Sequence, residues 1–229
     1  MTSPGRGEGW FPNVLDGPSH GYPGRLLAIE GSDGSGKTRF VNWLTATVGD
    51  RIPCLHVLAP GEYLRRYRYW YRDWNEPGDE PVAWRTDPVA DVGLALMGIG
   101  DRLVRQSAVI EPALRQGHLV ICERFALTPL VFKSDRIFLE PLRRLFRPDA
   151  GVLFDAPTEV LVERVRARAD IPVPPDFVAG KRREAERFRR LAESNGYAVV
   201  DTSRSDDYPE LRPILEKLLD GSMREEVHP

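Results

Sequence analysis

A group of residues suited to binding phosphate lies between Gly31 and Thr38, where the chain reads GSDGSGKT. This segment fits G-x-x-x-x-G-K-[ST], the pattern of a phosphate-binding P-loop. Its glycines let the backbone curl so that several N–H groups converge on one anion. Lys37 could bridge the β- and γ-phosphates of a nucleoside triphosphate, and the Thr38 hydroxyl could coordinate Mg²⁺. The residues predicted to hold the triphosphate are Gly31, Ser32, Gly34, Ser35, Gly36, Lys37 and Thr38.

The flanking segments are those that a P-loop needs on either side. Residues 26–29 (LLAI) form a short apolar run, as a buried strand should, and apolar residues recur at helical spacing within 40–44 (FVNWL). The helix would begin near Lys37 and direct the positive end of its dipole at the same phosphates. A glycine-rich turn that fitted the motif by accident would need neither element. We therefore predict that the chain binds a nucleoside triphosphate.

Strands and helices alternate along the rest of the chain, and no interval is typical of a hairpin. This alternation predicts an α/β fold in which a five-stranded parallel sheet carries helices on both faces. Gly98 and Gly100 could kink the long helix before the third strand. The further strands are predicted at 52–58, 118–122, 150–154 and 197–200, and the helices at 91–116, 158–168, 176–194 and 208–220, with shorter ones from Thr128 and near 139–146.

The length of the chain indicates a single large domain. The 229 residues carry a net charge of −2, which argues against a non-specific nucleic-acid binder. Cys54 and Cys122 lie in apolar runs, and are expected to be buried thiols of a cytoplasmic protein. No apolar run is long enough for a membrane span, and no signal-peptide core is present. We expect a flexible arm at 1–24, the domain at 25–221 and a short tail at 222–229.

Charged residues follow the third predicted strand directly. Glu123 could hold Mg²⁺ or one of its waters, and Arg124 could bind an acceptor phosphate through two hydrogen bonds. Ligands of parallel sheets bind beyond the carboxyl ends of the strands, which favours these roles over a buried ion pair. Asp33, within the P-loop, could orient the acceptor or a water, or only form hydrogen bonds within its own turn.

The segment 62–74 (EYLRRYRYWYRDW) mixes aromatic residues and arginines without a clean apolar face. It could be a helix whose aromatic and arginine side chains line an acceptor pocket. It could equally be a surface helix whose arginines extend over partly buried aromatic rings. The proline- and acid-rich segment 75–88 is predicted to be a loop.

Three segments of the chain resemble those of a known family. Three segments, IEGSDGSGKT, GDRLVRQSAVIEPALRQGHLVICERF and PDAGVLFDAPTEVLVERVRAR, are similar in order and spacing to signature segments of thymidylate kinases. The resemblance implies a nucleoside monophosphate kinase fold, phosphoryl transfer from ATP·Mg²⁺ to an acceptor phosphate, and a homodimer. It further implies that Asp33 lies near the acceptor sugar, Arg124 on the acceptor phosphate and Arg102 near the acceptor base.

The chain departs from the family pattern in the acceptor half. Residues 123–125 read Glu-Arg-Phe, where the family has Asp-Arg-Tyr or Asp-Arg-His. Residues 58–62 read LAPGE in place of Arg-Glu-Pro-Gly-Gly, so a phosphate-binding arginine is missing unless Arg65 or Arg66 replaces it. Gly98 stands where the family has the aromatic residue that stacks on thymine. These departures leave the acceptor open.

The resemblance also places a mobile lid around 166–176, from which Arg166 or Arg168 would reach the transferring phosphoryl group. The catalytic residues would then be Lys37, Asp33, Arg124 and Arg168. A deoxynucleoside kinase is the alternative, since Glu-Arg at 123–124 is similar to that family's motif. Its base would have to be Glu62, which is otherwise expected to contact the acceptor, or Asp33. A nucleotide-binding protein without catalysis is a further alternative.

Overall fold

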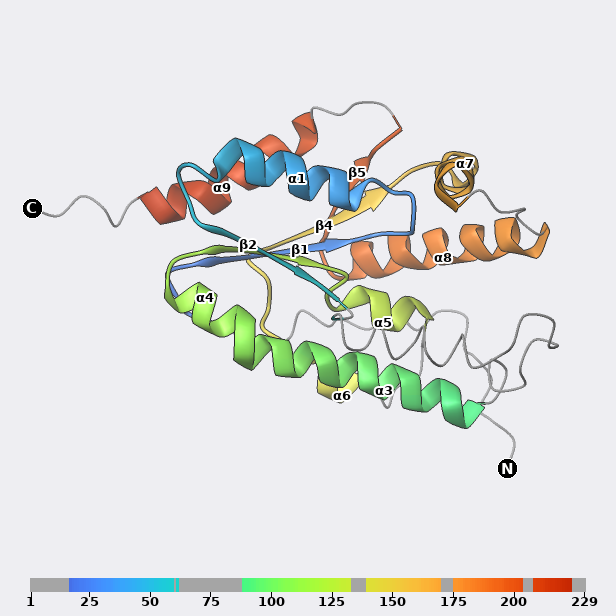
Figure 1. Cartoon of the computed structure of the whole chain (residues 1–229), viewed down its shortest axis with the longest axis horizontal. Coiled ribbons are helices and arrows are strands. Elements are labelled where there is room, and N and C mark those ends of the chain that lie inside the picture. The colour runs from blue at the N-terminus through green and yellow to red at the C-terminus, as the bar shows by residue number, and fades with distance from the viewer. Residues whose placement is uncertain are drawn as a thin grey trace, which may run out of the picture.

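The computed structural model describes residues 17–59, 61, 88–132, 139–169, 175–203 and 208–223. A five-stranded sheet forms its middle layer, and helices cover both faces (Figure 1). All strand pairs are parallel, and the order is β2-β3-β1-β4-β5, which confirms the predicted fold class. The strands are β1 (Arg25–Glu30), β2 (Cys54–Leu58), β3 (Leu119–Glu123), β4 (Ala150–Asp155) and β5 (Ala198–Asp201).

One hydrophobic core lies on each face of the sheet. One core packs α1 and α9 on one face, around Phe40 and Phe154, and the other packs α3, α4, α5 and α8 against the opposite face, around Leu114 and Phe188 (Figure 1). The helices are α1 (Lys37–Val48), α3 (Pro88–Arg105), α4 (Glu111–Arg115), α5 (Leu127–Phe132), α6 (Leu139–Leu142), α7 (Thr158–Ala169), α8 (Pro175–Ser194) and α9 (Arg212–Met223), with a 3₁₀ turn at Pro209–Leu211.

The long helix before β3 is interrupted, but not at the glycines. α3 runs through Gly98 and Gly100, and a π-helical segment, Gln106–Ile110, joins it to α4. Pro112 has no N–H to give to an i−4 carbonyl, so a regular helix would lose a hydrogen bond here. The Gln106 side chain uses the wider turn to donate to the Arg144 carbonyl and to accept from the Phe146 N–H. The helix is therefore interrupted by a π-helical segment at Gln106–Ile110, about two to three turns after the glycines.

Residues 17–24, expected to belong to a flexible arm, make specific contacts with the domain. The imidazole of His20 contacts Asp149 at 2.9 Å, and the Tyr22 hydroxyl donates to Glu111 at 2.7 Å. The Gly24 N–H donates to the Leu114 carbonyl. These contacts connect the residues before β1 to α4 and to the loop that precedes β4. Residues 1–16 and 224–229 lie outside the described residues, and α9 continues past the expected boundary at 221.

The register brings the chemically interesting strand ends together. Glu123 is paired with both Ile29 of β1 and Leu58 of β2, so the end of β3 lies between the start of the P-loop and the end of β2. Both cysteines are free thiols; Cys122 is buried as expected, while Cys54 is only half-buried. Among the described helices, none has the length and apolarity required to cross a membrane.

Candidate active site

The P-loop has the backbone geometry that the motif predicts. It connects β1 to α1, and Gly31, Gly34 and Gly36 all have positive φ, at 139°, 88° and 85°. Gly31 also packs closely against the sheet, since a Cβ there would lie 2.2 Å from the Phe154 carbonyl oxygen. A side chain at this position would push the loop away from β4. The loop therefore needs glycine for both its conformation and its packing.

Lys37, the first residue of α1, is held across the loop. Its ammonium donates to the Ser32 carbonyl at 2.8 Å and lies 3.4 Å from the Ser35 hydroxyl. Burial, together with the nearby charge of Arg124, lowers the pKa of Lys37 to about 8, although Asp33 and Glu123 act in the opposite direction. A bound phosphate would add negative charge beside this buried cation and so favour its protonated form.

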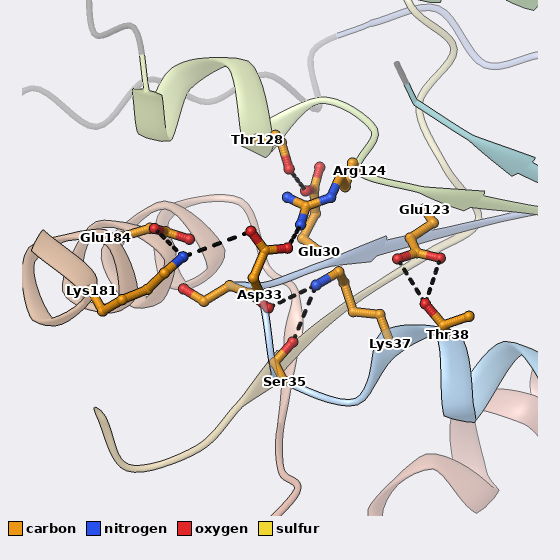
Figure 2. A network of polar contacts seen from close by, with 11 residues as sticks. Glu30, Asp33, Ser35, Lys37, Thr38, Glu123, Arg124, Thr128, Lys181 and Glu184 are labelled. Carbon is orange, nitrogen blue, oxygen red and sulfur yellow. Dashed lines mark hydrogen bonds and ion pairs between the residues drawn. The ribbon is translucent and has the colours of Figure 1, made fainter. Parts of the chain in front are cut away.

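Thr38 and Glu123 form the pair predicted for the metal. The Thr38 hydroxyl lies 3.4 and 3.5 Å from the two carboxylate oxygens of Glu123 (Figure 2). His56 of β2 contacts the same carboxylate at 3.3 Å, a contact that the sequence did not indicate. Burial alone would raise the pKa of Glu123, but the hydrogen bond from His56 and the charge of Lys37 lower it. The carboxylate is therefore ionised and suited to a hard cation.

Asp33 lies between two cations that come from different elements. Arg124, just after β3, donates to one carboxylate oxygen, and Lys181 of α8 lies 3.8 Å from the other (Figure 2). Lys181 is held in turn by Glu184, at 2.7 Å. Burial would raise the pKa of Asp33, but Arg124 and Lys181 lower it below its usual value. The P-loop carboxylate is therefore a poor proton acceptor.

Arg164 of α7 contacts the P-loop, whereas the two predicted lid arginines on the same helix are exposed. Arg164 donates to the Gly34 carbonyl at 3.2 Å and to the Thr202 carbonyl at 2.8 Å, so it braces the P-loop against the end of β5. Arg166 and Arg168 are exposed, and the charge of Arg168 contributes to lowering the pKa of Asp33. Residues 170–174 of the expected lid lie outside the described residues.

The guanidinium of Arg102, on α3, lies against the backbone of the turn that follows β3. Its side chain is buried, and its three nitrogens donate to backbone carbonyls: Nη1 to Gly98 at 2.6 Å, Nη2 to Arg124 at 2.8 Å, and Nε to Phe125 at 2.5 Å. The contact with the acceptor base, which the resemblance implies for Arg102, stays a prediction. Glu30, at the end of β1, is also buried, and its charge acts on Arg102.

The remaining candidates and the metal can be placed only in part. Glu62, Arg65, Arg66 and the aromatic segment 62–74 lie outside the described residues. No cluster of three His, Cys, Asp or Glu side chains able to hold a metal occurs among the residues that are described. Mg²⁺ does not need one, because it is commonly bound through one or two protein oxygens together with substrate phosphates. Thr38 and Glu123 fit that requirement.

A P-loop followed by a helix, with a carboxylate and an arginine at the neighbouring strand end, defines a P-loop phosphotransferase. A family model described as thymidylate kinase matches residues 82–210. The thymidylate kinase of Burkholderia cenocepacia (strain HI2424) is 30% identical over 217 residues, covering 86% of this chain and 97% of the relative. That of Burkholderia mallei (strain NCTC 10229) is 29% identical over 221 residues, with the same coverage.

A solved structure supports the fold. The crystal structure of thymidylate kinase from Ehrlichia chaffeensis aligns with a TM-score of 0.53 at 21% identity, and the alignment covers 86% of this chain and all of that one. The family model and the relative at 30% identity show that the chain belongs to the thymidylate kinase family. It is a nucleotide kinase of a family that uses ATP.

Proposed function

We propose that this protein transfers the γ-phosphoryl group of ATP to the phosphate of dTMP. The observation that carries the proposal is the position of Arg124, whose guanidinium lies against the P-loop on Asp33, where it could bind an acceptor phosphate beside the γ-phosphate. The family relatives named above support dTMP as the acceptor. Lys37, Arg124 and a lid arginine, Arg166 or Arg168, would neutralise the charge that develops during transfer.

Mg²⁺ would be held by the Thr38 hydroxyl and the Glu123 carboxylate. The two groups lie within hydrogen-bond distance, so one ion could contact both directly or through its water. When bound, the ion would neutralise charge on the β- and γ-phosphate oxygens. The chain's own contribution is to keep Glu123 ionised, through His56 and Lys37, and to orient Thr38 at the start of α1.

The chemistry of the described residues favours an acceptor phosphate over a sugar hydroxyl. A sugar hydroxyl needs a base, whereas a phosphate is already a nucleophile. Ala59 follows β2, where nucleoside kinases would place that base, and the ion pairs of Asp33 lower its pKa and make it a weak one. The nucleoside kinase alternative would therefore depend on Glu62.

The acceptor can be identified by measuring ADP release from ATP·Mg²⁺ in the presence of each candidate in turn. The candidates are dTMP, dUMP, CMP, UMP, thymidine and deoxycytidine. We expect turnover with dTMP and weaker turnover with dUMP. A strong signal from a nucleoside and none from any monophosphate would overturn the proposal in favour of the alternative. Binding of ATP without turnover of any acceptor would support a non-catalytic protein.

We further propose that the protein acts in the cytoplasm as a homodimer that pairs through α3. Leu96, Met97 and Val104 are 46%, 41% and 67% exposed on this helix, and Gly100 lies between them. Exposed apolar side chains on one helix favour association with a second copy, as the family resemblance implies. Sedimentation should give a dimer for the wild type and a monomer for Val104→Asp, with Val199→Asp as the control at another exposed apolar residue. A wild-type monomer would contradict this proposal.

A further inference from the structure

The turn after β3 holds its most important side chain in an unusual backbone conformation. The Arg124 N–H still donates to the Ile29 carbonyl, as a continuing strand would, but its φ is 65°. Residues other than glycine rarely adopt this left-handed region, and they persist there only when the surroundings hold them. The direction of the Arg124 guanidinium toward Asp33 depends on this turn.

Arg102 holds the turn from the side of α3. Its Nη2 and Nε groups donate to the carbonyls of Arg124 and Phe125, and its Nη1 donates to Gly98 within its own helix. The side chain is only 5% exposed, so solvent does not compete with these hydrogen bonds. A planar guanidinium can contact two successive carbonyls in this way, whereas a single ammonium cannot match its geometry.

Glu30 holds the same turn from the side of β1. One of its oxygens accepts from the Leu127 N–H at 2.7 Å, and the other accepts from the Thr128 hydroxyl at 2.5 Å (Figure 2). Glu30 has no exposed surface, and its negative charge acts on Arg102. Arg102 therefore donates to the carbonyls at the start of the turn, and Glu30 accepts from the donors at its end.

We propose that Arg102 and Glu30 are positioning residues that fix the 124–128 turn and thereby direct Arg124 to the acceptor phosphate. Arg102 then acts through the backbone of Arg124, a role that does not require contact with the acceptor base. This inference rests on the proposed function, in which Arg124 binds that phosphate. Arg102 also donates to the carbonyl of Gly98, a residue that has no aromatic ring to stack on a base.

The first test is to compare acceptors with different bases. Arg102→Met should reduce kcat/KM for dTMP about 100-fold, as expected for a displaced binding group, and reduce kcat/KM for dUMP and dCMP by the same factor within about threefold. The affinity for ATP should stay within about threefold of the wild type. A loss confined to the preferred base would show that Arg102 reads the base, and would overturn the inference.

The second test is a double-mutant cycle with Arg124→Ala. If Arg102 acts through Arg124, adding Arg102→Met to Arg124→Ala should cost less than about threefold further, since residues that act as a unit are not additive. Independent, multiplicative losses would contradict the inference. Arg115→Met, which removes an exposed arginine of α4 at the other end of the sheet, is the control and should leave acceptor kinetics unchanged.

A third measurement does not depend on turnover. Hydrogen exchange in the peptide containing 124–128 should become faster in Arg102→Met and in the more conservative Glu30→Gln, while exchange in β1 is retained. Unchanged exchange in this turn would overturn the inference even if activity fell. If the wild type phosphorylated no acceptor, the proposed function would fail, but faster exchange would still support the bracing of the turn.

Discussion

Arg124, which follows β3, donates to the carboxylate of Asp33 in the P-loop. The phosphate-binding loop and the neighbouring strand end are thus joined by their own side chains. Lys181 of α8 lies on the other oxygen of the same carboxylate, so Asp33 is an anion between two cations. An acceptor phosphate would enter an environment in which positive charge is already arranged, and little reorganisation is needed at the moment of transfer.

Arg124→Ala should weaken acceptor use far more than nucleotide binding. We expect KM for dTMP to rise about 100-fold, since a charge-assisted contact of two hydrogen bonds is lost, while the Kd for ATP changes by less than about threefold. Arg124→Lys should recover only part of the loss, because an ammonium cannot make the paired contact. Steady-state kinetics with each substrate varied in turn would measure this. Equal losses for both substrates would show that Arg124 is a structural residue.

Lys37→Ala should abolish turnover. The ammonium is buried within the P-loop, and Lys37 is the only Lys or Arg in residues 31–38, so its loss should lower kcat by at least about 1,000-fold. Lys217→Ala, on the exposed surface of α9, is the matched control and should behave like the wild type. Normal rates in the Lys37 variant would contradict the mechanism.

Glu123→Gln should change the response to magnesium. The amide keeps the size of the side chain but removes the charge, so the Mg²⁺ concentration for half-maximal rate should rise about tenfold or more. Glu163→Gln, on the exposed side of α7, should leave the Mg²⁺ response unaltered. Titration of the initial rate with Mg²⁺ at fixed ATP would decide this, and identical curves for Glu123→Gln and wild type would remove Glu123 from the metal site.

Nucleotide affinity should depend on pH through Lys37. Burial lowers the pKa of this residue to about 8, and the protonated form is the one that attracts phosphate. Affinity for a non-hydrolysable ATP analogue should therefore be constant from about pH 7 to the pKa, then fall as pH rises, approaching tenfold per pH unit. Calorimetric titration between pH 7 and 9.5 would measure it. Lys37→Arg, which stays charged, should lose the dependence; a fall that survived in that variant would assign it to another group.

The donor half of the site could be predicted because its residues are contiguous in the sequence. The P-loop motif specifies Lys37 and Thr38 by spacing, and the alternation of strands and helices places Glu123 at the same edge. Glu30 carried a weaker signal, since it is a carboxylate at the last position of an apolar strand. A buried charge in that place needs partners, which only the fold reveals.

The contacts made by helices could not be predicted in the same way. α8 carries many charged residues, and no periodicity distinguishes Lys181, which faces Asp33, from its solvated neighbours. The same holds for Arg164 on α7, since no local pattern distinguishes it from Arg166 and Arg168. The direction of the Arg102 guanidinium depends on carbonyls that are 22 and 23 residues away in the chain. Such contacts are set by tertiary packing and not by local pattern.

One carboxylate at the amino ends of the strands affects the stability of this enzyme separately from its reaction. Asp149 binds His20 and the Leu26 N–H, and so fastens residues 17–24 across the amino ends of the strands. Every catalytic candidate described lies at the carboxyl ends instead. Substitutions of Asp149 should therefore change the temperature at which the chain unfolds while leaving its kinetics almost unaltered, because they remove contacts at the end of the strands that lies away from the reaction.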